Sequence, residues 1–175
     1  MLAKNIYKVF TTFYPVSIKL VSPFNYKARL WLKGRKDIFK RLNTSISPAD
    51  KIIWMHCASL GEFEQGRPVI EKLCIAYPSY KILLTFFSPS GYEVRKDYDG
   101  ADYIFYLPMD SKENAKRFFD IVNPALVIFV KYEFWHYYLN EAQNRQIPLL
   151  LISAIFRKSQ KFFSRQGNFY RQMLS

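Results

Sequence analysis

The chain has 175 residues, of which 50% are apolar and 18% aromatic, and this composition excludes disordered, collagen-like and low-complexity proteins. The formal charge of +12 is concentrated at the two ends, because residues 1–50 carry ten basic and two acidic residues and residues 157–175 carry five basic and no acidic ones. The residues between them are nearly neutral. This distribution predicts an anionic partner that the flanks contact, and both membrane phosphates and nucleic acid fit it.

The amino-terminal segment, residues 6–21, is apolar and aromatic but is interrupted by Lys8, Pro15 and Lys19. Its longest uncharged stretch, residues 9–18, is about half of the roughly 20 apolar residues that a membrane-spanning helix needs. We therefore expect the segment to lie at the headgroup level of a membrane without crossing it. The alternative is a helix that packs on the protein's own core.

A basic cluster follows this segment. Its members are Lys33, Arg35, Lys36, Lys40 and Arg41. Each basic residue near anionic lipid contributes on the order of 1 kcal/mol to membrane binding, so residues 1–45 are predicted to form an amphipathic, basic membrane-associating segment. Nucleic acid is the second candidate partner, but no helix-turn-helix, zinc or RNA-recognition pattern accompanies the cluster, and we do not predict nucleic-acid binding.

From residue 51 onward, short apolar runs alternate with segments of helical spacing. The expected strands are residues 51–58, 80–87, 103–107, 125–130 and 148–153, and the expected helices are residues 66–76, a short segment ending near 98, 111–122 and 134–144. Strands that are apolar on both faces and separated by helices are typical of a parallel sheet covered on both sides. Residues 46–157 are therefore predicted to form a Rossmann-like α/β domain, followed by a basic helix at 158–175.

Two cysteines, Cys57 and Cys74, lie in apolar runs and lack the spacing of metal ligands. We expect either a reducing compartment or buried, inert thiols, and no metal site.

Ligands of such a sheet bind beyond the carboxyl ends of its strands, so the residues that directly follow each strand form the candidate site. Ser59, Gly61 and Glu62 follow the first strand. Gly61 would let the backbone approach a ligand, and Glu62 could remove a proton from a sugar hydroxyl, a role worth about 10²–10⁴-fold in rate. The alternative for Glu62 is an acidic residue that only stabilises the start of a helix.

Other candidate residues follow the later strands or lie close to Glu62. Ser90 and Gly91 belong to a turn whose N–H groups could bind a phosphate or a carboxylate, and the alternative is an ordinary turn. Arg67 could reach a phosphate or could simply be solvated. Lys131 and Glu133 lie two residues apart after the fourth strand, so in extended backbone they would share a face and would either bind substrate or form ion pairs.

Several motifs, in this order along the chain, resemble the amino-terminal domain of the 3-deoxy-D-manno-octulosonic acid (Kdo) transferases. They are residues 54–62 (WMHCASLGE), Pro68 and Ile70, Tyr77 and Pro78, Thr85 with Ser90 and Gly91, Leu107 and Pro108 with Asp110, and Glu133 to Trp135. Residues 32–36 (LKGRK) resemble the basic segment that follows the membrane anchor in this family. The resemblance extends over about residues 30–157.

The resemblance implies a two-domain GT-B glycosyltransferase, which moves Kdo from CMP-Kdo to a glucosamine hydroxyl of a lipid A precursor. The reaction inverts the anomeric centre without a bound metal, at the cytoplasmic face of the inner membrane. By resemblance, Glu62 matches the glutamate assigned as general base, and Glu133 matches the glutamate of the family's Glu-Leu-Trp-Pro stretch. The partners implied are the lipid A precursor and the anionic membrane surface, with no cofactor besides the donor substrate.

The sequence departs from the family pattern at two positions, because Lys131 stands where many members carry an acidic residue and His136 replaces the usual proline. The family has two domains, and the resemblance here covers only the first. We therefore expect these residues to hold the acceptor but not to transfer sugar alone. In the basic carboxy-terminal stretch, exposed Phe162, Phe163, Phe169 and Tyr170 are expected to favour self-association. A non-catalytic lipid-binding module at the membrane surface is the alternative.

Overall fold

The computed structural model describes residues 2–155, with side chains from residue 6 onward. Its helices and strands are α1 (Leu2–Val21), α2 (Tyr26–Arg35), α3 (Ile38–Ser45), β1 (Ile52–Cys57), α4 (Leu60–Ala76), β2 (Lys81–Phe86), α5 (Pro89–Arg95), β3 (Tyr103–Tyr106), α6 (Lys112–Val122), β4 (Leu126–Val130), α7 (His136–Asn144) and β5 (Leu149–Ile152). The predicted alternation of strands and helices is confirmed. The expected basic helix at 158–175, with the self-association assigned to it, lies outside the described residues.

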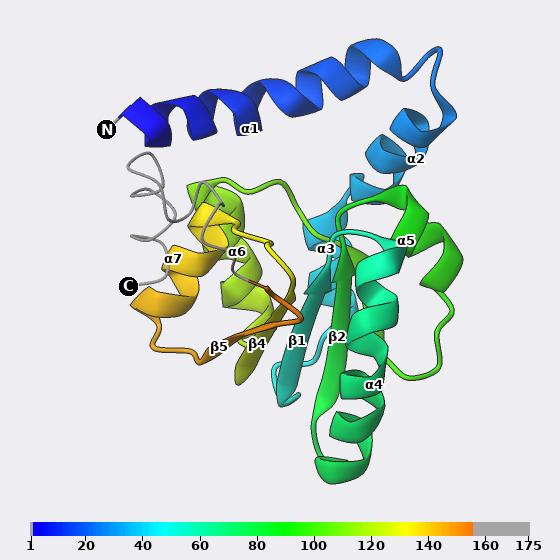
Figure 1. Ribbon diagram of the computed structural model, residues 1–175, viewed down its shortest axis with the longest axis vertical. Helices are drawn as coiled ribbons and strands as arrows, with labels where there is room; N and C mark the ends of the chain where they lie inside the picture. Colours follow the sequence, from blue (N-terminus) through cyan, green and yellow to red (C-terminus); the bar gives the residue numbers. More distant parts are fainter. Residues whose placement is uncertain (1, 156–175) are drawn as a thin grey trace.

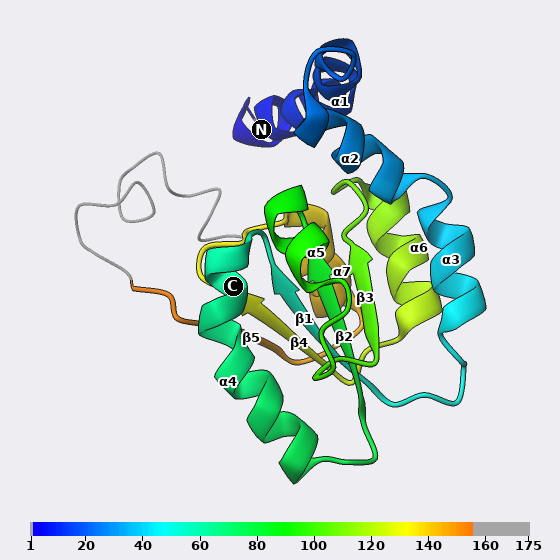
Figure 2. The same cartoon turned by 90° about the vertical axis from the view of Figure 1, so that its right-hand side faces the viewer.

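The five strands form one parallel sheet in the order β3-β2-β1-β4-β5. Helices α3, α6 and α7 cover one face of this sheet, and α4 and α5 cover the other (Figure 1, Figure 2). All six residues of the central strand β1 are buried, because strands lie on both of its sides and helices on both of its faces. This architecture confirms the predicted Rossmann-like α/β fold.

Alternate side chains of β1 enter the two cores. Trp54 packs with α6 and α7, whereas Met55 and Cys57 pack with α4. A Cβ atom at Gly66 would lie 2.8 Å from Met55 Sδ and 3.1 Å from a methyl group of Val130, so only glycine lets α4 lie directly against the sheet. Helix α4 begins at Leu60, six residues earlier than expected, and its first turn therefore includes Glu62.

Helix α1 crosses above the edge of the sheet at which the strands end, here called the carboxyl edge (Figure 1). It continues as one helix through Pro15. The Tyr7 hydroxyl donates a hydrogen bond to Asp110, which follows β3, and the Tyr14 ring lies 5.8 Å from the ring of Phe87, which follows β2. One side of α1 thus packs on the protein, as the alternative interpretation of this segment predicted.

The opposite side of α1 carries an exposed apolar stripe. Its members are Ile6, Val9, Phe10, Phe13, Val16 and Leu20. Their spacing of three or four residues places them on one helical face, so the helix is amphipathic with its apolar side turned away from the domain. Among the described residues, no helix is long and apolar enough to cross a membrane.

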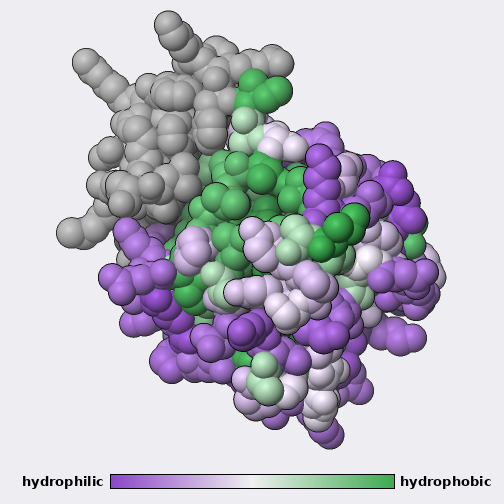
Figure 3. Space-filling view, turned by 90° about the horizontal axis from the view of Figure 1, so that it is seen from below, coloured by the Kyte–Doolittle hydropathy of each residue, from purple (hydrophilic) through white to green (hydrophobic). Residues whose placement is uncertain are grey.

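The end of the molecule opposite α1 presents a hydrophobic area, with mainly hydrophilic residues below and to the right of it (Figure 3). Strand β5 is an edge strand of the sheet, and its residue Leu150 is about half exposed. Apolar surface is therefore not confined to α1.

Asp110 joins α1 to α7. Its buried carboxylate accepts hydrogen bonds from Tyr7 and from the backbone N–H groups of Tyr137 and Tyr138, at 3.1 and 3.2 Å for the latter two. The backbone N–H of His136 in turn donates to the Tyr7 hydroxyl at 3.3 Å. One carboxylate thus holds the start of α7 and the start of α1 together.

Burial raises the pKa of Asp110 from 3.8 to about 6, although its hydrogen bonds oppose this. The folded chain therefore holds this proton more tightly than the unfolded chain does, so the free energy of unfolding should fall as pH rises from about 4 to about 6. The size of this fall is on the order of 3 kcal/mol. Urea unfolding at a series of pH values should show this fall in the free energy of unfolding in the unaltered chain and in the control Asp97→Asn, which changes an exposed residue. The fall should be absent in Asp110→Asn. An undiminished fall in Asp110→Asn would contradict this assignment.

Candidate active site at the carboxyl edge

Glu62 lies in the first turn of α4, directly after the end of the central strand β1. Its carboxylate accepts a hydrogen bond from the backbone N–H of Ala58, so the side chain turns back toward the strand end and is only partly exposed. Ser59 precedes the helix and makes no side-chain capping hydrogen bond. The short chain between β1 and α4 therefore fixes the Glu62 carboxylate at the carboxyl edge.

Gly61, next to Glu62, is exposed, and a Cβ atom placed on it would meet nothing within 4 Å. Its φ is not positive, so the fold itself does not require glycine at this position. Open space beside the Glu62 backbone is what the close approach of a ligand requires.

Glu133 forms the second acidic group of this edge, after β4. Its Oε2 accepts a hydrogen bond from Trp135 Nε1 at 2.7 Å and lies 3.5 Å from Nε2 of the buried His56. His56 Nδ1 lies 3.1 Å from the Thr85 carbonyl oxygen and 2.9 Å from the Thr85 hydroxyl. Because a carbonyl oxygen only accepts, Nδ1 carries a proton, and His56 is a hydrogen-bonded core residue.

The environment of Glu62 favours its neutral form. Burial raises the pKa of Glu62 above its usual value, and the negative charge of Glu133 raises it further. The Ala58 N–H, His56 and Lys131 act in the opposite direction. A carboxylate whose pKa is raised toward neutrality is a stronger general base than an ordinary surface glutamate, because it binds the transferred proton more tightly.

Lys131 directly follows β4 and adopts left-handed backbone with a φ of 65°. The expectation that extended backbone places it on one face with Glu133 is therefore wrong, because the strand ends at Val130. A non-glycine residue in this conformation costs about 1 kcal/mol. The positive charge of Lys131 nevertheless acts on the Glu62 carboxylate.

The turn after β2 is the ordinary turn that was the alternative to an anion site. The Ser88 hydroxyl accepts from the backbone N–H of Ser90 at 3.1 Å, and the Ser88 carbonyl accepts from that of Gly91 at 3.2 Å. The N–H groups expected to bind an anion are thus already used within the turn. Glycine at position 91 is explained by packing instead, because a Cβ atom there would lie 2.3 Å from the Phe86 ring.

Arg67 lies on the exposed side of α4, where its Nε is 3.4 Å from Glu64 and 4.0 Å from Glu71. The structure therefore places it in ordinary ion pairs along the helix and does not bring it into contact with Glu62 or Glu133. Among residues 6–155, no three His, Cys, Asp or Glu side chains are arranged to hold a metal ion.

Sequence reasoning missed Thr85 and Trp135 as the partners that hold His56 and Glu133. Thr85 lies opposite His56 in the β1–β2 register. Two polar residues at matched positions of otherwise apolar strands were the signal that could have found this pair.

The Glu133→Gln substitution removes the negative charge that raises the pKa of Glu62, so we expect the pKa of Glu62 to fall. Carbon-detected NMR titration of the Glu62 side chain measures this value directly. The matched control Glu71→Gln changes an exposed carboxylate farther along α4 and should leave the Glu62 titration unchanged. An unchanged or higher pKa of Glu62 in Glu133→Gln would show that the two carboxylates are not coupled.

The chain is similar to known proteins both in its sequence and in its fold. The crystal structure of a UDP-N-acetylglucosamine 2-epimerase superposes with a TM-score of 0.50 over 71% of this chain and 39% of that one, at 16% identity, which shows similarity of fold alone. The 3-deoxy-D-manno-octulosonic acid transferase of Haemophilus influenzae is 32% identical over 61% of this chain and 25% of its own length. That of Aquifex aeolicus is 31% identical over 70% of this chain and 34% of its own.

The corresponding transferase of Chlamydia pneumoniae is 25% identical over 97% of this chain and 42% of its own length. The chain therefore matches between a quarter and about two fifths of the length of these curated relatives. The family model described as 3-deoxy-D-manno-octulosonic-acid transferase (kdotransferase) matches residues 32–175. With most of its length matched in this way, the chain belongs to the Kdo transferase family and carries the amino-terminal domain of that family.

Proposed function

We propose that this chain is the acceptor-side domain of a glycosyltransferase that moves Kdo from CMP-Kdo to a glucosamine hydroxyl of a lipid A precursor. The observation that carries the proposal is the partly buried Glu62 carboxylate, fixed at the carboxyl edge beside Glu133 and raised in pKa. A base at this place can act on a hydroxyl that approaches from the open side of Gly61.

In the proposed reaction, the acceptor hydroxyl oxygen forms a bond to the anomeric carbon of Kdo while the bond from that carbon to the phosphate of CMP breaks. The hydroxyl proton passes to the Glu62 carboxylate, and CMP leaves with the electron pair. The charges of the Lys131 ammonium and the Glu133 carboxylate act on this base, and Trp135 and His56 hold Glu133 in place. No metal and no cofactor enters this scheme.

The proposed acceptor is a lipid, and α1 offers a way to reach it. The apolar stripe of α1 is exposed, while the other side of the same helix packs against the loops that follow β2 and β3. A helix of this kind lies in the plane of a membrane interface, where nearby Lys and Arg side chains contact anionic headgroups. We therefore place the domain on the cytoplasmic face of the inner membrane, with the carboxyl edge next to the lipid.

We propose that the donor is bound mainly by a second domain, because the chain matches only 25% to 42% of the length of these curated relatives. These 175 residues are thus proposed to bind acceptor and not to transfer Kdo without that domain. Closure of two domains over both substrates excludes water from the reacting donor, and one domain cannot provide this.

Joining this chain to the part of the Aquifex aeolicus relative that follows the matched region allows transfer to be measured. Kdo transfer to the lipid A precursor should fall by about 10²–10⁴-fold in Glu62→Gln, because the general base is lost while the shape of the side chain is kept. The matched control Glu71→Gln on the same helix should retain full transfer. Unchanged transfer in Glu62→Gln would contradict the role of Glu62 as the base and would favour a non-catalytic lipid-binding role for this domain. Transfer by the 175 residues alone would contradict the proposed need for a second domain.

Membrane association is tested separately by sedimentation with vesicles that contain phosphatidylglycerol. The double substitution Phe10→Asp/Phe13→Asp places charge in the apolar stripe, and because each Phe contributes about 1.5–3 kcal/mol when buried, binding should weaken by more than tenfold. The control Thr12→Asp/Thr44→Asp adds the same charge at exposed polar positions outside the stripe and should weaken binding far less. Equal losses in both variants would mean that the stripe does not enter the membrane.

A further inference from the structure

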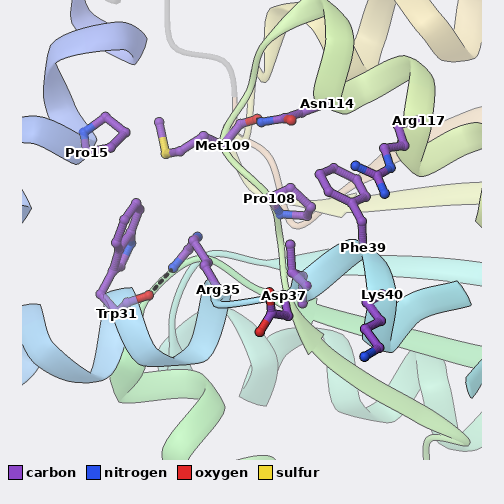
Figure 4. Close-up of a pocket in the computed structure, with 11 residues that line it drawn as sticks. Pro15, Trp31, Arg35, Asp37, Phe39, Lys40, Pro108, Met109, Asn114 and Arg117 are labelled. Carbon is purple, nitrogen blue, oxygen red and sulfur yellow. Dashed lines mark hydrogen bonds between the residues drawn. The ribbon is translucent and has the colours of Figure 1, made fainter. Parts of the chain in front are cut away.

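An open cavity of about 440 Å³ lies between α1, the α2–α3 segment and the loop that follows β3. Figure 4 shows Trp31 and Arg35 on one side of it, Phe39 and Arg117 on the other, and Pro108 between them. Lys40 also lines the cavity. None of these residues belongs to the Glu62 and Glu133 group, so the cavity is a second feature of the carboxyl edge.

The charges around this cavity are mostly positive and mostly unneutralised. Among the described residues, no carboxylate lies within 4 Å of the charged nitrogens of Arg35, Lys40 or Arg117. Asp37, which is exposed, is the acidic residue of the lining. The cavity therefore has a net positive charge and attracts an anion.

Arg35 is the most enclosed of the three cations. Its guanidinium lies 3.9 Å from the centroid of the Trp31 ring and 4.9 Å from that of Phe87. It donates hydrogen bonds to the carbonyl oxygens of Leu107 at 2.9 Å, Phe87 at 2.8 Å and Trp31 at 3.4 Å. Neutral carbonyls and aromatic rings thus surround this charge, and burial lowers the pKa of Arg35.

An enclosed cation without an anionic partner is costly, because the carbonyls replace only part of its hydration. A bound anion at the cavity would offset this cost. Lys40 and Arg117, on the other side, would supply a second and a third positive charge, with Arg117 already oriented by its stacking over the Phe39 ring at 4.4 Å. Several convergent cations, of which arginine is the best suited to planar, two-point contacts, match a phosphate with two negative charges.

We propose that this cavity binds a phosphate monoester, and that the phosphate is the headgroup of an amphiphile. The apolar part of the lining, which includes Pro15 of α1, would contact the carbon atoms next to the phosphate. Because Pro15 belongs to the helix that carries the exposed apolar stripe, a lipid headgroup would enter between the membrane-facing helix and the sheet. The proposal does not depend on glycosyl transfer.

The test measures binding to the 175-residue chain by calorimetry, using dihexanoyl phosphatidic acid below its micelle concentration, inorganic phosphate and dihexanoyl phosphatidylcholine. Lys40→Gln/Arg117→Gln removes two exposed cations of the cavity and leaves Arg35 in place. The matched control Lys51→Gln/Lys72→Gln removes two exposed lysines outside the cavity, one directly before β1 and one near the end of α4. Circular dichroism confirms that each variant is folded.

Saturable binding of phosphatidic acid, weakened about tenfold or more in Lys40→Gln/Arg117→Gln and unchanged in the control, supports the proposal, because each charged hydrogen bond contributes at least that much. Phosphatidylcholine should bind much more weakly. Inorganic phosphate that binds as tightly as phosphatidic acid, with the same loss, would overturn the lipid as the source of the phosphate. Absence of saturable binding by either phosphate probe, or equal losses in the two double variants, would overturn the site itself.

Discussion

The parallel register of β1 with both β2 and β4 is the constraint on which the rest of the structure depends. His56 lies opposite Thr85 on one side and Phe129 on the other, so the three strands end at the same level. Because parallel strands end at one edge, the segments that carry Glu62 and Glu133 must emerge there together. The hydrogen bonds of His56 to Thr85 and of Trp135 to Glu133 then fix the second carboxylate beside the first.

Helix α1 adds a second layer to this edge. Tyr7 and Asp110 join it to the loop after β3 and to the start of α7, while its apolar stripe remains exposed. The same helix borders the cationic cavity through Pro15. A surface suited to a membrane, a cavity suited to a phosphate and a pair of coupled carboxylates are therefore connected through one edge of the sheet. This arrangement suits an acceptor that is both lipid and anion.

Much of the fold could be predicted because the five strands are short apolar runs between polar turns, a local property of the sequence. The strands were predicted to within two residues at each end. The early start of α4 and the uninterrupted course of α1 through Pro15 could not be predicted from the sequence. Tertiary packing outweighs local helix propensity at both places. The position of Glu62 at the carboxyl edge could be predicted from the order and direction of the strands alone. The use of the Ser90 and Gly91 N–H groups inside their turn and the left-handed backbone of Lys131 required coordinates.

The central claim is that the edge around Glu62 receives a sugar hydroxyl of a phosphorylated glucosamine lipid. The most direct measurement follows the backbone amide resonances of the chain during titration with a deacylated, phosphorylated glucosamine disaccharide, which is soluble and cannot insert into a membrane. The account predicts that the largest shifts fall on residues 58–62 and 131–133. Shifts confined to the opposite edge, at residues 48–51 and 78–81, or no shifts at millimolar disaccharide, would contradict it.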